Sequence, residues 1–516
     1  MSLQQLLEDL SQPTAYPFVV DEVQVRQTHI SVVFLAGVWA YKIKKPVNLG
    51  FVDFTTPARR KHFCEEEVRL NRRLAADVYH GVVAISRDKH GLKVEGTGTA
   101  VEWAVKMTRL PDEATLAHQV QAGQITPTVL ESLAAKIAAF HRAAESGAHI
   151  ADFGRWHTVS GNARENFAQT QCHVGVTVSQ AVHGRLRALT EAALAKYHAL
   201  IDDRAVRHVP RDTHGDLRLA HVYSFPDRPP PQDLVVIDCI EFNERFRYAD
   251  PVADMAFLVM DLLFRGRRDL AGVFADAYFR AAADAEGRAL LPFYTAYRAV
   301  VRAKVEGMEL FEKEIPRGEK HEAGARARAH WLMALGELEQ PERRPCLVLV
   351  GGLPGTGKST LARGLADGSC FKVLRSDAVR KELTGVDSDI YSGEWTRRTY
   401  EECLQRAEEL LFQGERVVVD AGFRHAWMRA LFFEAARRWG VPLLVLWCHA
   451  DRETVRQRLQ ARTGDVSDAD WSVYQQLESD WEPAVNLPGV HEISTEDCPE
   501  AVAAHARELL RGAGLA

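Results

Sequence analysis

The sequence lacks a long uninterrupted hydrophobic run and a basic segment at its start. Its most apolar stretch, residues 252–264, is interrupted by Asp254 and Asp261, whereas a membrane helix needs about 20 consecutive apolar residues. The opening segment, MSLQQLLEDL, carries acids where a secretory signal peptide would carry Lys or Arg. These absences argue against a membrane-spanning or secreted protein. We expect a soluble, cytoplasmic protein without a membrane partner.

Cysteine is scarce, and neither sign of charge is in strong excess. The 8 cysteines are scattered without a C-x-x-C pair, which is typical of reduced thiols in a cytoplasm and supplies no zinc site. The 64 Lys and Arg residues nearly balance the 70 Asp and Glu residues, for a net charge of -6. Such a chain has no general field for holding nucleic acid phosphates. Nucleic acid is therefore a disfavoured partner.

The chain is too long for one domain. At 516 residues it is about three times a typical domain length, so two or three domains are expected. Strand patterns dominate residues 17–45 and return before residue 107, and helical patterns prevail from about residue 126. After the polar segment 339–345, apolar runs alternate with helical stretches, as in a parallel α/β sheet. We predict a domain boundary near residue 340.

A phosphate-binding motif opens the C-terminal segment. GLPGTGKST fits G-x-x-x-x-G-K-[ST] and lies between an apolar strand and a helix. Its glycines let backbone N–H groups wrap a phosphate, and the helix N-terminus adds positive charge. Lys358 is expected to reach the β- and γ-phosphates of ATP, and the Ser359 hydroxyl to hold Mg²⁺. The predicted nucleotide-binding residues are Gly352, Leu353, Pro354, Gly355, Thr356, Gly357, Lys358, Ser359 and Thr360.

Charged residues beyond this motif are candidate catalytic groups. Asp420 ends an apolar strand and would order the Mg²⁺ shell. Asp377 would accept a proton from an acceptor hydroxyl, and Arg380 would steady a phosphate. Arg458 and Arg462 are one helical turn apart and suit a lid that closes on the transferring phosphate. The alternatives are a helix cap at the start of RSDAVRKEL and a solvated arginine-rich face.

These motifs resemble those of P-loop kinases of the zeta-toxin, polynucleotide-kinase and gluconate-kinase type. RSDAVRKEL resembles their Asp-x-x-Arg substrate motif, and VVVDAGF resembles their V-D-A-T-F strand end, with Gly422 where Thr is common. Those families phosphorylate hydroxyl groups on sugars, nucleotides or nucleic-acid ends. The resemblance implies a kinase that uses ATP and Mg²⁺, and it leaves the acceptor open.

Residues 213–242 carry a second group of candidate catalytic residues. In THGDLRLAHVY, the turn at His214 and Gly215 would aim Asp216 at a substrate hydroxyl as general base. Asp238 ends the strand VVID farther along the chain and would bind Mg²⁺ that bridges the ATP phosphates. An Asx turn followed by a strand-end acid is the structural alternative.

This second pattern resembles the aminoglycoside-phosphotransferase-like kinases, which are relatives of protein kinases in fold. Their H-G-D-x-x-x-x-N motif is matched except that His221 stands at the Asn position. Imidazole is a poorer ligand for Mg²⁺ than an amide oxygen. Either one metal suffices, or the domain is weakened or only binds nucleotide. DPVADMAF resembles the family's D-P-x-x-D-L-A, in which Asp254 would hold the catalytic loop.

The same resemblance implies a strand lysine that pairs with the ATP phosphates and with an acid on the next helix. Lys42 in AYKIKK is the best match, and Lys44 is the alternative because residues i and i+2 of a strand share a face. The partner acid is Glu67 or Glu66, and a surface ion pair is the structural alternative. The backbone of residues 105–111 would form the hinge that meets adenine.

The whole arrangement resembles bacterial two-part proteins that join an aminoglycoside-phosphotransferase-like domain to a P-loop ATP-binding domain. We expect an α+β protein-kinase-like domain in residues 1–340, with lobes divided near residue 107, and an α/β P-loop kinase domain with a parallel sheet in 341–516. The expected function is ATP-dependent phosphotransfer to small-molecule hydroxyls at two Mg-ATP sites. The alternatives are a regulatory N-terminal domain that controls one active P-loop kinase, and a nucleic-acid end kinase.

Overall fold

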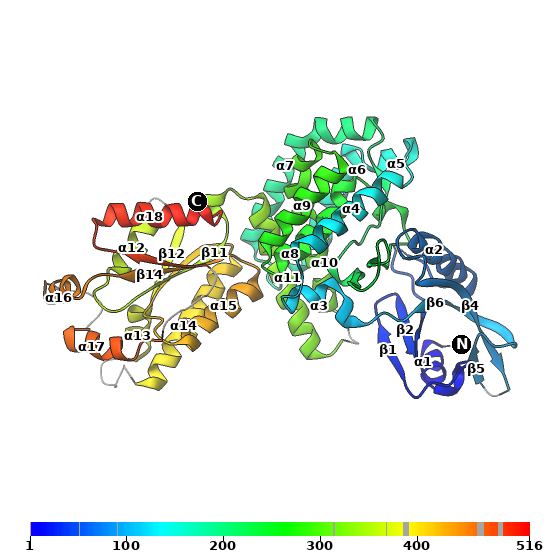
Figure 1. The fold of residues 1–516 in the computed structure, drawn as a ribbon, viewed down its shortest axis with the longest axis horizontal. Helices are drawn as coiled ribbons and strands as arrows, with labels where there is room; N and C mark the ends of the chain where they lie inside the picture. Colours follow the sequence, from blue (N-terminus) through cyan, green and yellow to red (C-terminus); the bar gives the residue numbers. More distant parts are fainter. Residues whose placement is uncertain are drawn as a thin grey trace. The chain divides into compact units, whose positions relative to one another are not determined.

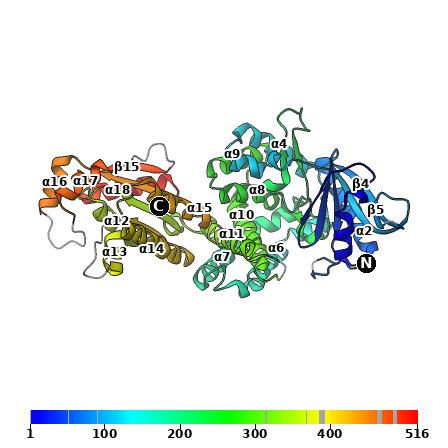
Figure 2. The same cartoon turned by 90° about the horizontal axis from the view of Figure 1, so that it is seen from below.

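The computed structural model describes residues 2–50, 52–89, 91–312, 315–367, 369–384, 392–461, 469–482 and 489–516. The chain forms two compact units (Figures 1 and 2). Unit 1 comprises Met1–Val159, Tyr197–Leu263 and Arg267–Leu291, and unit 2 comprises Ser160–Lys196, Phe264–Gly266 and Pro292–Ala516. Unit 2 thus includes helices that precede residue 340, and the domain boundary at that residue stays a prediction. Within the described ranges, no helix has the length and apolar character needed to span a membrane.

Unit 1 contains a six-stranded antiparallel sheet in the order β1-β2-β3-β6-β4-β5. The central strand β3 pairs with β2 on one side and with β6 on the other. Apolar side chains of the sheet form a buried core with the first helix of the chain. The strands are β1 (Val23–Gln27), β2 (Ser31–Ala36), β3 (Trp39–Lys44), β4 (Tyr79–Asp88), β5 (Gly91–Val94) and β6 (Thr99–Thr108).

Helix α2 (Pro57–Ala75) packs against this sheet and brings one acid to it. Thr56 caps the helix by accepting the Arg59 N–H, and a proline occupies the first turn, where its missing N–H costs nothing. The residues Cys64, Glu67, Val68 and Asn71 are buried at the i, i+3, i+4, i+7 spacing of one helix face. This spacing places Glu67, and not Glu66, on the face that is turned to the sheet.

The remainder of unit 1 is mainly helical. Helix α8 (Pro251–Phe264) is buried on nearly all sides, which explains its continuous apolar sequence. A short hairpin of β8 (Val222–Ser224) and β9 (Leu234–Val236) pairs Val222 with Val236. The other elements are α1 (Leu3–Leu10), α3 (Leu116–Gln121), α4 (Pro127–Ala143), α5 (Ala148–Phe153), the C-terminal part of α7 (Gln180–Val206), β7 (Arg211–Asp212), β10 (Tyr248–Ala249) and α9 (Arg268–Ala282).

Unit 2 contains a five-stranded parallel sheet in the order β12-β13-β11-β14-β15. Helices α12 and α18 cover one face of the sheet, and α14 and α15 cover the other (Figure 1). Strand β11 is buried along its whole length, as expected for a parallel sheet with helices on both faces. The strands are β11 (Cys346–Gly351), β12 (Phe371–Arg375), β13 (Arg416–Asp420), β14 (Leu443–His449) and β15 (Val490–Ser494).

The described helices of unit 2 include several from the middle of the chain, before the parallel sheet. They are α6 (Trp156–Gln169), the N-terminal part of α7, α10 (Leu291–Glu309), α11 (Arg317–Leu338), α12 (Lys358–Ala366), α13 (Ser376–Thr384), α14 (Gly393–Phe412), α15 (Ala426–Trp439), α16 (Arg452–Ala461), α17 (Trp471–Ser479) and α18 (Pro499–Gly512). The predicted fold class is confirmed in its architecture: an α+β part with an antiparallel sheet is followed by an α/β part with a parallel sheet and a P-loop.

Candidate functional site

The candidate site of unit 1 is centred on Lys42 of strand β3. Its Nζ lies 2.6 Å from Asp238 Oδ1 and 2.8 Å from Glu67 Oε1. The strand, helix α2 and the segment after β9 therefore bring together three residues that are far apart in the sequence. The pairing of Lys42 with Glu67 is one of those that the family resemblance implies, whereas the contact of Lys42 with Asp238 was not predicted. Their roles with a nucleotide stay predictions.

A second lysine lies on the same strand face and shares the same acid. Lys44 Nζ is 2.5 Å from Glu67 Oε2 and forms a buried ion pair with Glu241. Glu67 therefore bridges both lysines, but only Lys42 also contacts Asp238. Glu66, the alternative partner, pairs instead with Arg69 on its own helix.

The charges in this chain of ion pairs support one another. Burial acts to raise the pKa of Glu67, but the two lysines overcome it and hold that pKa below its usual value. Burial likewise acts to raise the pKa of Asp238, but the charge of Lys42 outweighs it, and the pKa is lowered. Burial and its acidic neighbours raise the pKa of Glu241. The site thus holds Glu67 and Asp238 ionised beside lysines that stay charged.

Asp238 adopts a backbone conformation that is uncommon for a residue with a side chain. Its φ is +66°, in the left-handed region. Its N–H donates to the Tyr79 hydroxyl at 3.2 Å, and the next N–H, of Cys239, donates to Asn71 Oδ1 at 2.9 Å. These two hydrogen bonds hold the strained residue, a feature that recurs at functional sites.

The turn that carries Asp216 is held by Asp254, as the sequence predicts. One carboxylate oxygen of Asp254 accepts the His214 N–H at 3.1 Å, and the other accepts the Gly215 N–H at 2.8 Å. Gly215 has φ +84°, and a Cβ there would lie 2.8 Å from the Phe246 carbonyl oxygen. Only glycine fits this turn without strain.

Asp216 has a partner that the sequence analysis did not single out. Arg218 Nε lies 2.9 Å from Asp216 Oδ1. The same arginine contacts His221, whose Nε2 is 3.0 Å from the Arg218 side-chain nitrogen. His221 also lies 3.5 Å from Asp238 Oδ2, so it stands between the two candidate catalytic carboxylates. The position of Arg218 in HGDLR, two residues after Asp216, was the available signal.

His214 is buried behind Asp216 in a neutral form. Its Nε2 lies 2.9 Å from the Ile237 carbonyl oxygen, and its Nδ1 accepts the Asp216 N–H at 3.3 Å. Burial lowers the pKa of His214 from 6.5 to about 4. The neutral ring therefore fixes the backbone of Asp216.

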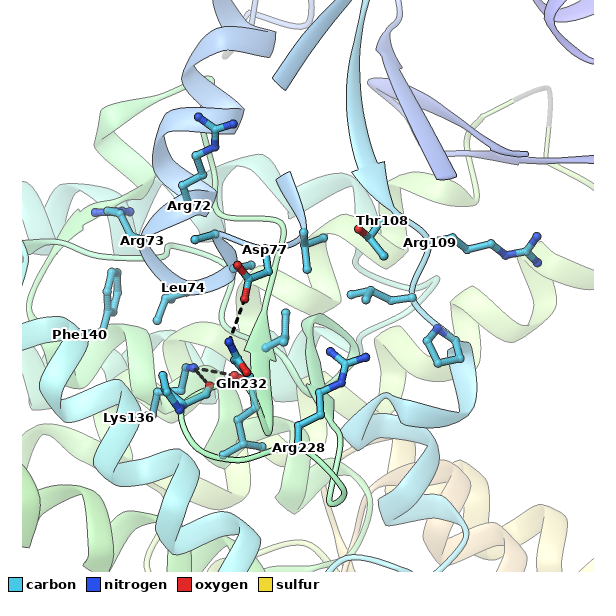
Figure 3. A pocket seen from close by; sticks show the side chains of 18 residues that line it. Arg72, Arg73, Leu74, Asp77, Thr108, Arg109, Lys136, Phe140, Arg228 and Gln232 are labelled. Carbon is cyan, nitrogen blue, oxygen red and sulfur yellow. Dashed lines mark hydrogen bonds between the residues drawn. The ribbon is translucent and has the colours of Figure 1, made fainter. Parts of the chain in front are cut away.

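A cavity of about 430 Å³ lies elsewhere in unit 1, beside the hinge segment. Figure 3 shows Arg228 pointing into it, Gln232 hydrogen-bonded to Asp77, and Lys136 bonded to backbone carbonyls. Its walls come from the end of α2, residues 108–111, α4 and the β8–β9 loop. None of the predicted catalytic or metal-binding residues lines this cavity.

In unit 2 the P-loop connects β11 to the start of α12. Gly352 has φ +143°, and a Cβ there would lie 2.5 Å from the Cys448 carbonyl oxygen. Gly355 and Gly357 also have positive φ, so the loop depends on glycine at each of these turns. Lys358 Nζ lies 3.4 Å from the Leu353 carbonyl oxygen of the same loop. The remaining predicted residues, which include Pro354, Ser359 and Thr360, lie in the same continuous segment, residues 352–360.

The end of strand β13 brings Asp420 beside the P-loop. Asp420 pairs in register with Val350, directly before the loop. Burial raises the pKa of this carboxyl, against the opposing effects of Lys358 and of a hydrogen bond with Ser359. Among the described residues, its buried Oδ1 has no hydrogen-bond partner. The Asp420 carboxylate, with its unpaired buried oxygen, and the nearby Ser359 hydroxyl would together fit Mg²⁺, which prefers oxygen ligands.

Asp377 and Arg380 lie in the first turns of α13, next to this site. Both are half-buried, and Asp377 is close enough to Asp420 to raise the pKa of its carboxyl, as a smaller cause than burial. Near Gly422, the Tyr400 hydroxyl accepts the Phe423 N–H at 2.9 Å. Tyr400 was not found from the sequence, because it lies on α14 without a motif around it.

Arg458 does not extend into open space. Its guanidinium donates to Thr495 Oγ1 at 3.1 Å and to the Thr495 carbonyl oxygen at 2.6 Å. Thr495 in turn donates to the Thr356 carbonyl oxygen of the P-loop at 2.8 Å. Arg458 is therefore linked to the loop through Thr495, and a direct contact with phosphate stays a prediction. Arg462 lies outside the described residues.

Neither site forms a complete metal centre from side chains alone. Within the described part of the chain, no group of three or more His, Cys, Asp and Glu residues is placed to hold a metal ion. A cation at Asp420 and Ser359, or at Asp238, would need oxygens from a nucleotide or water. Kinase sites hold Mg²⁺ in this way, through one or two carboxylates and the substrate phosphates.

Replacing Lys44 by Met should destabilise unit 1, because Glu67 and Glu241 would then share a buried region with one cation fewer. Breaking a buried ion pair costs about 3–5 kcal/mol. Calorimetric melting should show a lower transition for Lys44→Met but not for the exposed control Lys89→Met. The double variant Lys44→Met/Glu241→Gln should recover part of the loss, since the surplus carboxylate charge is removed. Equal melting of Lys44→Met and wild type would contradict this interpretation.

His214 should stay neutral well below its ordinary pKa. Because folding lowers this pKa from 6.5 to about 4, its contribution to stability is complete above pH 6.5 and is lost as the pH falls toward 4. An NMR titration of the His214 ring, assigned with His214→Gln, should give a midpoint near 4. The variant should also flatten the fall of stability in that range. A ring that titrates near 6.5 would show that it is not enclosed as described.

Comparisons with known proteins identify one family model and two relatives of high coverage. A family model described as "AAA domain" matches residues 347–483. "Uncharacterized protein Rv2004c" of Mycobacterium tuberculosis and "Uncharacterized protein Mb2027c" of Mycobacterium bovis are each 35% identical to this chain over 483 residues, which cover 91% of this chain and 93% of each relative.

Solved structures of kinases are also similar to parts of the chain. An aminoglycoside 2'-phosphotransferase-IIIa is 13% identical, with a TM-score of 0.38, and the match covers 61% of this chain and 94% of that one. A choline/ethanolamine kinase family protein from Mesorhizobium loti is 13% identical, with a TM-score of 0.37 and coverage of 65% and 99%. A gluconokinase from Sinorhizobium meliloti is 20% identical, with a TM-score of 0.25 and coverage of 33% and 93%.

The AAA-domain match of residues 347–483 includes the P-loop of unit 2 and indicates a nucleotide-binding domain there. The two mycobacterial relatives match along nearly their whole length and not only in the P-loop segment. The chain belongs to the same family as these two mycobacterial proteins.

Proposed function

We propose that the protein is an ATP-dependent phosphotransferase with an ATP site in each unit, and that both sites act on hydroxyl groups of small-molecule acceptors. The observation that supports this proposal is that each unit places a lysine or a P-loop beside a carboxylate. Unit 1 has Lys42 between Glu67 and Asp238, and unit 2 has a P-loop with Ser359 beside Asp420. Each arrangement combines a cation for phosphate with a carboxylate for a metal ion.

In the site of unit 2, the backbone N–H groups of the P-loop and Lys358 would hold the β- and γ-phosphates. Ser359 and Asp420 would hold Mg²⁺, which neutralises charge on the phosphate oxygens when bound. Asp377 would take the proton of the acceptor hydroxyl as the acceptor oxygen bonds to the γ-phosphorus and the bond to the β-phosphate oxygen breaks. Arg380 would neutralise charge on the transferring group. Arg458 and Arg462 are proposed to act at the same step.

In the site of unit 1, Lys42 would exchange its contact with Asp238 for the phosphates of ATP. Asp238 would then be available to a metal ion. Asp216 would accept the proton of the second acceptor hydroxyl, and its pairing with Arg218 favours the ionised form that this requires. Because phosphoryl transfer relies mainly on positioning and on charge neutralisation, these few groups are sufficient in principle.

A regulatory role for unit 1 is the second candidate. Two observations favour it: His221 occupies the position of the amide ligand, and Arg218 occupies one side of Asp216. In that case unit 1 would bind a nucleotide without transfer and control the P-loop site. A nucleic-acid end kinase remains the least supported alternative, because the net charge of -6 offers no general attraction for phosphates.

Transfer of labelled γ-phosphate from ATP into the small-molecule and RNA fractions of a cell extract tests these alternatives. Lys358→Ala should remove one labelled small-molecule product and Asp216→Asn another, each by roughly 100-fold or more, because each residue acts at a different transfer step. The matched surface controls Lys372→Ala and Asp203→Asn should keep both products.

Three other outcomes decide against parts of the proposal. If Lys358→Ala removes all label and Asp216→Asn removes none, unit 1 is a regulatory module. Label that appears only in the RNA fraction would identify a nucleic-acid end kinase. If both variants keep both products, the assignment of the catalytic residues is wrong.

A further inference from the structure

His221 occupies a position between the two candidate catalytic carboxylates of unit 1, and its two ring nitrogens have different partners. Nδ1 lies 2.9 Å from the Asp216 carbonyl oxygen. Nε2 lies 3.0 Å from an Arg218 side-chain nitrogen and 3.5 Å from Asp238 Oδ2. The ring is buried against the catalytic loop.

These contacts specify which nitrogen carries the proton. A carbonyl oxygen can only accept, so Nδ1 of His221 carries its hydrogen. Arginine can only donate, so Nε2 presents its lone pair. A histidine that donates one ring N–H to a carbonyl and presents the other nitrogen unprotonated has the arrangement of a metal ligand.

His221 Nε2, whose lone pair accepts the Arg218 N–H, also lies 3.5 Å from a carboxylate oxygen of Asp238. Lys42 Nζ lies 2.6 Å from Asp238 Oδ1, so the other carboxylate oxygen, Oδ2, is the one that faces His221 Nε2. Two such atoms 3.5 Å apart, with no proton between them, are suited to share a cation. Neighbouring ligands of an octahedral ion with bonds of about 2.1 Å lie about 3 Å apart.

The chemistry of this pair does not match Mg²⁺. Magnesium is a hard ion that prefers oxygen ligands, whereas imidazole suits transition metals. Mn²⁺ combines the two preferences, because it accepts carboxylate and phosphate oxygens and stands in the series of divalent ions that bind nitrogen. Nucleotide phosphates and water would complete its coordination, as the described residues alone supply too few ligands.

We propose that the nucleotide site of unit 1 takes Mn²⁺ in preference to Mg²⁺, with His221 Nε2 and Asp238 Oδ2 as its protein ligands. This inference rests on the proposed ATP site of unit 1 and specifies its metal ion. Arg218 would turn its terminal nitrogen away from His221 as the ion binds. Because the guanidinium is planar and moves as a whole, another of its N–H groups would then take over the contact that Nε makes with Asp216 at 2.9 Å.

The first test measures nucleotide affinity with each metal ion in the full-length chain. Lys358→Ala removes the P-loop site, and calorimetry then follows the β,γ-methylene analogue of ATP with Mn²⁺ or with Mg²⁺. We expect at least about tenfold tighter binding with Mn²⁺. Adding His221→Asn should bring the two affinities to within about twofold, since an amide oxygen suits both ions. Adding His149→Asn, a change at an exposed histidine of unit 1, should leave the preference intact.

The second test detects the metal–nitrogen bond itself. Pulsed electron paramagnetic resonance of bound Mn²⁺ should show coupling to a directly bonded ring nitrogen in Lys358→Ala, and the coupling should be absent in Lys358→Ala/His221→Asn. The methylene analogue has no nitrogen in its phosphate chain to confuse the signal. His221→Gln serves as a second variant if His221→Asn does not fold, and melting curves check both.

Each outcome decides the proposal. Equal affinity with both metal ions, or bound Mn²⁺ without nitrogen coupling, would overturn the role of His221 and leave the ATP site of unit 1 standing. No nucleotide binding to Lys358→Ala with either ion would overturn the proposed site and this inference together. A preference for Mn²⁺ that persists in His221→Asn would assign it to other residues and would also overturn the inference.

Discussion

The site of unit 1 depends on one buried acid, Glu67, that is shared by two lysines. Lys42 and Lys44 approach different oxygens of its carboxylate, at 2.8 and 2.5 Å. From there the contacts continue to Asp238 and to Glu241, so that strand β3, helix α2 and the segment after β9 are joined through one side chain. Removing one partner would leave a buried charge without compensation, which costs about 3–5 kcal/mol. The position of the candidate metal ligand Asp238 thus follows from that of Glu67.

The candidate site of unit 2 is built from a backbone loop and not from ion pairs between side chains. Its phosphate-binding surface is backbone, and the constraint is space: the Cys448 carbonyl oxygen would lie 2.5 Å from a Cβ at Gly352. Side chains support the loop from behind, as Thr495 does by donating to the Thr356 carbonyl oxygen. The loop therefore has no room for a side chain at Gly352. Unit 1, in contrast, brings Lys42, Glu67 and Asp238 together through ion pairs between side chains.

The site of unit 2 could be recognised from the sequence more easily than the site of unit 1, because one is a continuous loop and the other joins distant side chains. The P-loop could be recognised because its residues are consecutive and because its glycines all serve to let the backbone wrap a phosphate. Lys42 and Glu67 could be proposed only through a family resemblance, because a sheet and a helix bring them together, whereas Asp238 was proposed from its place at the end of a strand. The choice between Lys42 and Lys44 could not be made from strand periodicity, which puts both on one face, and the structure uses both. Glu241, Arg218, Thr495 and Tyr400 were not found, because their roles arise from contacts between distant segments or from positions without a motif.

The central claim is that one chain binds two nucleotides at independent sites. Equilibrium dialysis of an ATP analogue that cannot transfer its phosphate, in the presence of both Mg²⁺ and Mn²⁺, measures this directly as nucleotides bound per chain. The account predicts two for the wild-type protein, one for Lys42→Met, one for Lys358→Ala and none for the double variant. A wild-type value of one that Lys42→Met does not change would contradict the account, because unit 1 would then hold no nucleotide.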